Sequence, residues 1–211
     1  MTEKRIVFSK SGALIYISHL DLNHAFIRAI ARAGLKLVHS QGFNPHPKIV
    51  FALPLSVGAY GECEMADITL ENDISSQELF AKLVSVMPKG IEILEVREPD
   101  IKFKKVKSAL YTAEIFSNLD VSEKIRALLS NPLVVTKKSK SGQRDVDISP
   151  MIEEFDISYG GEKTVLKMTL SSSSELYLNP EYVIGAIFER VFLQNLQYTL
   201  TRNKIIFDKE A

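Results

Sequence analysis

The order of strand and helix patterns constrains the fold of this chain more than any other feature of its sequence. A strand pattern at residues 4–8 is followed by an amphipathic helix, short strand patterns at 35–39, 49–57 and 62–71, a second helix, and a strand at 91–96. Apart from the short strand at 35–39, this order is β-α-β-β-α-β. It is typical of the ferredoxin-like motif.

The first helix has sequence signals at both of its ends. Ser18 stands at the position of an N-cap, and Asp21 follows three residues later, a pairing like that of a capping box. Gly34 is expected to end the helix. The apolar residues recur at helical spacing: Leu22, Phe26, Ile30 and Ala33.

The same order of elements returns in the second half of the chain. We expect a strand at 109–116, a helix at 121–129, strands between 133 and 170, a helix at 180–193 and a closing strand at 198–207. Between the halves, residues 99–107 carry four lysines and a proline. We therefore predict an α+β chain of two tandem ferredoxin-like halves with antiparallel sheets, 1–98 and 108–211, joined by a basic linker at 99–107.

Composition excludes several classes of protein. With 26 basic and 26 acidic residues, the chain has no overall basic excess of the kind that marks many nucleic-acid-binding proteins. Its single cysteine excludes a disulfide framework. The sequence has no run of 18 apolar residues and no signal peptide, so we expect a cytoplasmic protein without a membrane partner.

Familiar catalytic signatures are missing from the sequence as well. It has no phosphate-binding loop, no dinucleotide-binding glycine motif, no zinc-protease motif and no hydrolase elbow. We therefore predict no cofactor, and the sequence names no reaction.

One stripe of the first helix carries charged and titratable side chains opposite its apolar face: Asp21, His24, Arg28 and Arg32. The stripe suits an anionic ligand, because the planar fork of arginine matches phosphate or carboxylate. The alternative is a solvated helix face on which Asp21 only favours the positive end of the helix.

The loop at 41–48 is polar, aromatic and stiff at once. Two prolines restrict its backbone, and Phe43 and His46 have rings that stack well on a base. Gln41 and Asn44 supply paired donors and acceptors for the edge of a heterocycle. The alternative is a rigid surface turn with Phe43 buried in the core. Helix and loop together give the predicted ligand-binding residues: Asp21, Arg28, Arg32, Gln41, Phe43, Asn44, His46 and Lys48.

All four histidines lie between residues 19 and 46. His19 falls in the first turn of the helix, where the helix dipole favours a neutral imidazole that accepts a proton; its alternative role is packing. His19 and His46 are the candidates for a catalytic base. Glu62 and Glu64 share one face of a strand and, with His19, are metal-ligand types. Because no tight ligand spacing supports a metal site, we predict none.

Several strings of residues carry a family resemblance: Phe8-Ser9-Lys10-x-Gly12, Ser18-His19-Leu20-Asp21-Leu22, Ser40-Gln41-Gly42-Phe43-Asn44-Pro45-His46-Pro47-Lys48 and Glu62-x-Glu64. Together they resemble the bacterial radical SAM-linked domain family. Its members occur alone or attached to, or encoded beside, a radical SAM protein. The chain departs from the family at His24, where an arginine is common.

The resemblance implies that the chain is a stand-alone member that works with a radical SAM partner. Radical SAM chemistry needs three cysteines on its cluster, and this chain has only Cys63. The chain is therefore not expected to generate the radical itself.

These observations favour a substrate-binding accessory module for RNA or another anionic substrate, acting with a radical SAM protein. One alternative is a histidine- or metal-dependent enzyme that acts on RNA or on a phosphorylated substrate. A second alternative is a non-catalytic assembly protein that docks on its partner through a sheet edge.

Overall fold

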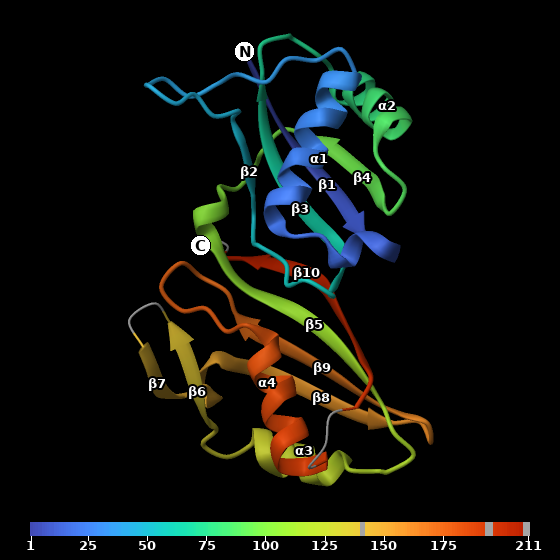
Figure 1. Cartoon of the computed structure of the whole chain (residues 1–211), viewed down its shortest axis with the longest axis vertical. Coiled ribbons are helices and arrows are strands. Elements are labelled where there is room, and N and C mark those ends of the chain that lie inside the picture. Colours follow the sequence, from blue (N-terminus) through green and yellow to red (C-terminus); the bar gives the residue numbers. More distant parts are fainter. Residues whose placement is uncertain (140–141, 193–195, 209–211) are drawn as a thin grey trace. The chain divides into compact units, whose positions relative to one another are not determined.

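A computed structural model describes residues 1–139, 142–192 and 196–208 of the chain (Figure 1). The chain divides into two units, Met1–Lys105 and Val106–Ala211, here called the N-terminal and the C-terminal unit. Both combine helices with antiparallel strand pairs, so the predicted α+β class with antiparallel sheets is confirmed. No helix among the described residues is both long and apolar enough to cross a membrane.

The N-terminal unit contains four strands and two α-helices among its named elements: β1 (Thr2–Lys10), α1 (His19–Arg32), β2 (Ile49–Phe51), β3 (Tyr60–Leu70), α2 (Ser76–Val86) and β4 (Ile91–Arg97). Strand β1 lies between β4 and β3, and β2 pairs with the other edge of β3. All three pairings are antiparallel. A 3-10 turn at Gly12–Tyr16 leads from β1 into α1.

Helix α1 forms where its sequence signals place it. The Ser18 side chain accepts the backbone N–H of Asp21 at 3.1 Å, which satisfies one of the free donors at the helix start. The apolar stripe of α1 is buried against alternate residues of the strands and against α2. The shared core includes Ile6, Phe8, Leu22, Phe26, Ile30, Ala66, Ile68, Leu70, Leu79 and Leu83.

One strand prediction in this unit is wrong, and another is too long. Residues 35–39 form only isolated bridges at Leu37 and His39, because the chain passes the end of β3 and turns back at once. The strand predicted at 49–57 ends at Phe51. The chain leaves the sheet before Pro54, which has no N–H to donate to a neighbouring strand.

A fully buried arginine joins β1, β3 and the segment that follows β4. The Arg5 guanidinium donates from Nε and Nη2 to the two carboxylate oxygens of Asp67, at 2.7 and 2.8 Å. It also donates to the Asp100 carboxylate at 3.1 Å and to the carbonyl of Ile101 at 2.6 Å. The ring of Phe103 lies 4.4 Å from the guanidinium carbon, a cation–π contact. The start of the predicted linker is thereby fixed onto the N-terminal unit.

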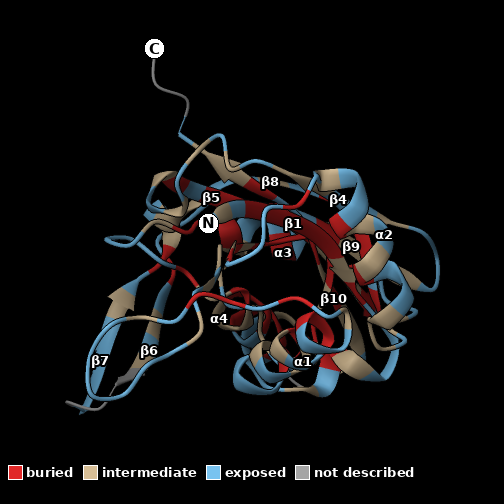
Figure 2. Ribbon diagram, turned by 90° about the horizontal axis from the view of Figure 1, so that it is seen from above, coloured by how far each residue is buried: buried red, intermediate tan, exposed pale blue. Residues whose placement is uncertain are grey.

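The C-terminal unit has six strands and two α-helices among its named elements: β5 (Val106–Phe116), α3 (Ser122–Leu129), β6 (Val134–Ser139), β7 (Gly142–Asp147), β8 (Ile152–Tyr159), β9 (Lys163–Ser171), α4 (Pro180–Ile187) and β10 (Tyr198–Phe207). Strand β5 lies between β10 and β9, and β8 pairs with β9, all antiparallel. Within the described part of the chain, β6 and β7 pair only with each other. Figure 2 shows this hairpin as mostly exposed.

The C-terminal unit differs from the sequence prediction at two places. Val106 and Lys107 of the predicted linker already belong to β5, and a 3-10 turn precedes them at Phe103–Lys105. The helix predicted at 180–193 is α-helical only to Ile187, followed by a π-helical turn at Phe188–Phe192; residue 193 lies outside the described part. Tyr198 on β10 holds α4 in place, because its hydroxyl donates to Glu181 at 2.6 Å.

The Arg5 contacts predict an unequal dependence on the two carboxylates. Replacing Asp67 with alanine leaves a buried guanidinium without its bidentate partner, so we expect the free energy of unfolding to fall by about 3 kcal/mol. The matched control is Asp100→Ala, whose carboxylate is 58% exposed and is expected to cost clearly less. Urea denaturation measures both losses. Equal losses in the two variants would contradict the role given to Asp67.

Candidate functional site

The predicted site residues all lie in the N-terminal unit, at three places. His19 and Asp21 are at the start of α1, Arg28 and Arg32 follow along its length, and the remaining residues are on the loop before β2. The structure describes each of these residues, so their surroundings can be compared directly.

His19 is positioned by a chain of aromatic rings that extends from the core to the surface. Phe8 and Phe26 lie 4.8 Å apart between ring centroids, and Phe26 contacts Phe51 edge-on at 5.3 Å. Phe51 in turn contacts the imidazole of His19 at 5.1 Å, also edge-on. The packing role considered for His19 is therefore present, and it also fixes the orientation of the ring.

Two buried charged residues lie at the same end of the sheet as His19. The Lys10 ammonium is buried and donates to the carbonyl of Ile15 at 3.4 Å. Glu64 is buried as well, and its carboxylate folds over Gly61, the residue paired with Lys10 in the sheet. The neighbouring strands thus bring an ammonium and a carboxylate to the same end of the inner face.

Sequence reasoning did not select Lys10, although the sequence carries a signal for it. Lys10 follows Phe8 by two residues, and Glu64 precedes Ala66 by two, so both occupy positions that face the core. A charged residue at such a position needs a buried partner, so its place in the strand pattern indicates a buried polar interaction.

The neighbourhood changes the acidity of two groups at the start of α1. Partial burial lowers the pKa of His19, and the positive charge of Lys10 lowers it further. The hydrogen bond from the Ser18 hydroxyl lowers the pKa of Asp21. His19 is thus held as a neutral imidazole near pH 7, able to accept a proton, and Asp21 is held as a carboxylate that caps the helix.

The side chains of the charged stripe of α1 differ in whether they make a structural contact. His24 and Arg28 are exposed on the helix. Arg32 is also exposed, but its guanidinium donates to the carbonyl of Val86 at 2.7 Å, at the last residue of α2. Arg32 therefore has a structural contact that joins the two helices, while Arg28 points its charge to solvent.

The loop at 41–48 is held at its base and exposed at its tip. The backbone N–H of Ser40 donates to the carbonyl of His46 at 2.8 Å, and the N–H of His46 donates to the Ser40 hydroxyl at 2.9 Å. A bridge between His39 and Pro47 closes the base. Phe43 is fully exposed, so the alternative in which it is buried in the core is wrong. Gln41, Asn44, His46 and Lys48 are exposed as well.

The start of α1 and the loop lie at different ends of the sheet. Lys10, which acts on His19, pairs with Gly61 at the start of β3, whereas the base of the loop runs beside Thr69 near the end of β3. In Figure 1 the loop extends from the end of the sheet where α1 finishes. The structure therefore does not bring His19 and the loop residues together into one site.

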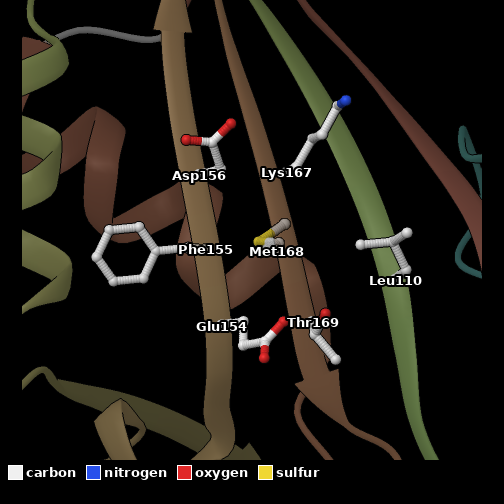
Figure 3. A pocket seen from close by; sticks show the side chains of 7 residues that line it. All are labelled: Leu110, Glu154, Phe155, Asp156, Lys167, Met168 and Thr169. Atoms are coloured by element: carbon white, nitrogen blue, oxygen red, sulfur yellow. The ribbon is translucent and has the colours of Figure 1, made fainter.

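A pocket in the C-terminal unit has the wrong charge for an anionic ligand. It measures about 140 Å³ and is lined by Leu110, Glu154, Phe155, Asp156, Lys167, Met168 and Thr169. Figure 3 shows its two carboxylates on β8 beside the single lysine of β9. Two negative charges against one positive charge disfavour phosphate. Among the described residues of the whole chain, no three histidine, cysteine, aspartate or glutamate side chains form a group that would hold a metal ion.

Comparison with protein families decides where the chain belongs. The profile of a family described as "Uncharacterized protein conserved in bacteria (DUF2344)" matches residues 4–180. The chain belongs to this family. No curated protein matches the chain in sequence.

Comparison with solved structures adds information about the fold alone. A chain of the "Crystal Structure of a Cbf5-Nop10-Gar1 Complex" is similar to this family member with a TM-score of 0.54 at 10% identity. The match covers 96% of this chain and 48% of the other, so the chain spans about half the length of that protein.

Two further structures are similar over almost the whole chain but with low TM-scores. An unknown protein from Galdieria sulphuraria gives 0.28 at 11% identity, with 95% of this chain and 97% of that chain covered. A putative glycine cleavage system transcriptional repressor gives 0.25 at 9% identity, with 98% of each chain covered. Similarity at this level carries no argument about the fold.

The His19 environment predicts a measurable titration. We expect NMR of the imidazole to show a midpoint below 6.5, and Lys10→Gln to raise that midpoint by removing a neighbouring charge. Lys4→Gln is the matched control: Lys4 is also buried on β1 but lies about 20 Å along the strand, beyond the range of strong interaction.

The sign of the effect on stability follows from the same lowered pKa. The unfolded chain binds a proton at this imidazole more readily than the folded chain does. The contribution of His19 to the free energy of unfolding is therefore complete above pH 6.5 and is lost as the pH falls. A His19 midpoint unchanged by Lys10→Gln would contradict the contribution of Lys10.

Proposed function

We propose that this chain is a binding module for an anionic substrate, and specifically for single-stranded RNA. The observation that carries the proposal is the fully exposed ring of Phe43 at the tip of a loop whose base is held by hydrogen bonds. Exposing a phenylalanine to water is unfavourable, and a base that stacks on it removes that cost. Stacking on an aromatic platform is the common way in which proteins bind unpaired bases.

The exposed cations and amides of the loop and of α1 suit the same ligand. Lys48 is the exposed last residue of the loop, and Arg28 is exposed on α1, so both are available to phosphate oxygens. Gln41 and Asn44 flank the ring in sequence and are exposed, with donors and acceptors for base edges. This combination suits RNA as the ligand better than a small anion, because a small anion has no ring that could stack on Phe43.

We also propose that both units are ferredoxin-like. In the N-terminal unit β1 lies between β4 and β3 with β2 beside β3, and in the C-terminal unit β5 lies between β10 and β9 with β8 beside β9. Numbered within each unit, and with the β6–β7 hairpin treated as an insertion after α3, the two sheets have the same order. The order, and the alternation of helices with strands, support a repeated motif.

The proposed partner is a radical SAM protein, to which this module presents its substrate. The support is the resemblance of the Ser18–Asp21 and Ser40–Lys48 strings to a family found with such proteins. The single cysteine, Cys63, agrees with this division of labour because it leaves the cluster to the partner.

The test is RNA binding by the purified chain, measured by fluorescence anisotropy with labelled oligo(A) and oligo(U) of about 12 nucleotides. We expect Phe43→Ala to weaken binding about 5- to 150-fold, the loss of one stacked base. Lys48→Ala should reduce the slope of log affinity against log salt by about 0.7, the loss of one phosphate contact.

The matched control for Phe43 is Val84→Ala, which removes an exposed apolar side chain from α2. It is expected to bind RNA as the wild type does. An unmodified chain that binds neither oligonucleotide, or an affinity that does not fall between about 50 and 200 mM salt, would refute the proposal.

A second candidate function, an enzyme that acts on RNA with His19 as the base, is favoured by one observation. Burial and Lys10 lower the pKa of His19, which suits a group that accepts a proton near neutral pH. This function predicts RNA cleavage by the purified chain, abolished in His19→Gln and retained in His24→Gln on the exposed stripe. Intact RNA after incubation with the wild type would exclude it.

A further inference from the structure

A pocket of about 250 Å³ lies beside the base of the exposed loop, within the N-terminal unit. Its walls come from four segments: the second half of α1, residues 35–37, the loop base and the residue that follows β3. The lining residues are Ile27, Ile30, Ala31, Leu35, Lys36, Leu37, His39, Pro47 and Glu71. Most of this lining is apolar, and no element of the proposed function above uses it.

The pocket has a floor of fixed shape. Ile30, Leu35 and Leu37 are buried members of the core, so they do not rearrange freely. The two other sides are held by backbone contacts: the bridge of His39 with Pro47, and the N–H of Glu71 donating to the carbonyl of Lys36 at 2.9 Å. A ligand would therefore meet a formed pocket.

Three polar side chains are exposed at the rim of this apolar floor. Lys36 supplies donors, Glu71 supplies acceptors, and the imidazole of His39 supplies one or the other. A flat, apolar object with donors and acceptors along its edge fits such a lining. The volume is below the range of about 300–1,000 Å³ of pockets that enclose a whole drug-sized ligand.

We infer that this pocket holds one unstacked base of the bound RNA. The inference rests on the proposed function, which brings RNA to the neighbouring loop. Proteins read single-stranded RNA by placing individual bases on apolar or aromatic surfaces and by hydrogen bonds to their edges. The face of the base packs on the apolar floor, and its edge forms hydrogen bonds with Lys36, Glu71 and His39.

The surroundings of the pocket supply what the rest of the nucleotide needs. Arg28 precedes Ala31 by three residues, so the two side chains are neighbours on the surface of α1. Its exposed guanidinium is thus available to the phosphate of a nucleotide whose base enters the pocket. Pro47 belongs both to the pocket and to the base of the loop that carries Phe43.

The experiment fills the pocket and leaves the loop unchanged. Ala31 is exposed on α1 and lines the pocket, and leucine is a good helix former, so Ala31→Leu occupies the pocket without disturbing the helix. The matched control is Ala81→Leu, the same change at an exposed position of α2. Each variant is measured with oligo(A) of about 12 nucleotides and with an abasic ribose–phosphate chain of equal length.

We expect Ala31→Leu to bind oligo(A) at least about 5-fold more weakly than the wild type and to bind the abasic chain equally well. His39→Ala, which removes a rim group and fills no space, is expected to weaken oligo(A) binding in the same selective way. Crosslinking with an oligonucleotide that carries 4-thiouridine is expected to label the peptide around His39 and Pro47.

The outcomes separate this inference from the proposed function. If Phe43→Ala weakens oligo(A) binding while Ala31→Leu and His39→Ala do not, the pocket does not hold a base, and the RNA-binding proposal stands. An equal loss for the abasic chain in Ala31→Leu also overturns the inference. If the wild type binds no RNA, both fail together.

Discussion

The interaction on which the N-terminal unit most depends is the burial of one guanidinium, that of Arg5. Moving such a charge out of water costs several kcal/mol, and only close partners offset that cost. Arg5 also stands opposite Arg97 on β4, a pairing of like charges that is unfavourable by itself. Asp67 and Asp100 compensate, and the hydrogen bond from Arg97 lowers the pKa of Asp100. The carboxylates thereby fix both the register of the sheet and the path of the chain after β4.

The opposite face of the same sheet carries the aromatic side chains that position His19. Phe8, Phe26 and Phe51 form a continuous aromatic contact that ends at His19, so the orientation of the imidazole follows from core packing. The loop with Phe43 depends on a different constraint, the hydrogen bonds at its base. Because the two places are held independently, a change in one need not disturb the other, which allows the two proposed functions to be tested separately.

Local signals in the sequence were sufficient for the start of α1, whereas features that depend on contacts between distant residues were predicted less well. The N-cap at Ser18 depends on residues three apart, and it forms as predicted. The prediction of a strand at 35–39 was wrong because the pairing of this segment depends on where β3 ends, about thirty positions later. The same limit applies to the site: residue types selected His19 and the loop, but only the structure shows that the charge of Lys10 acts on His19 and that Glu64 lies over Gly61, the residue paired with Lys10.

The exposure of Phe43 bears on the proposed binding function through the free-energy cost of ordering a loop. A flexible loop loses conformational entropy when it binds, at about 1–2 kcal/mol for each backbone residue that becomes fixed. Here the prolines and the Ser40–His46 hydrogen bonds fix much of the backbone before any ligand arrives. The loop backbone has therefore lost this conformational entropy on folding, before any ligand binds, and the folded chain also leaves a phenylalanine exposed to water. A ligand that covers the ring removes the apolar surface of Phe43 from water, and it binds without ordering the loop. A stiff loop with an exposed aromatic ring therefore favours binding over a purely structural role.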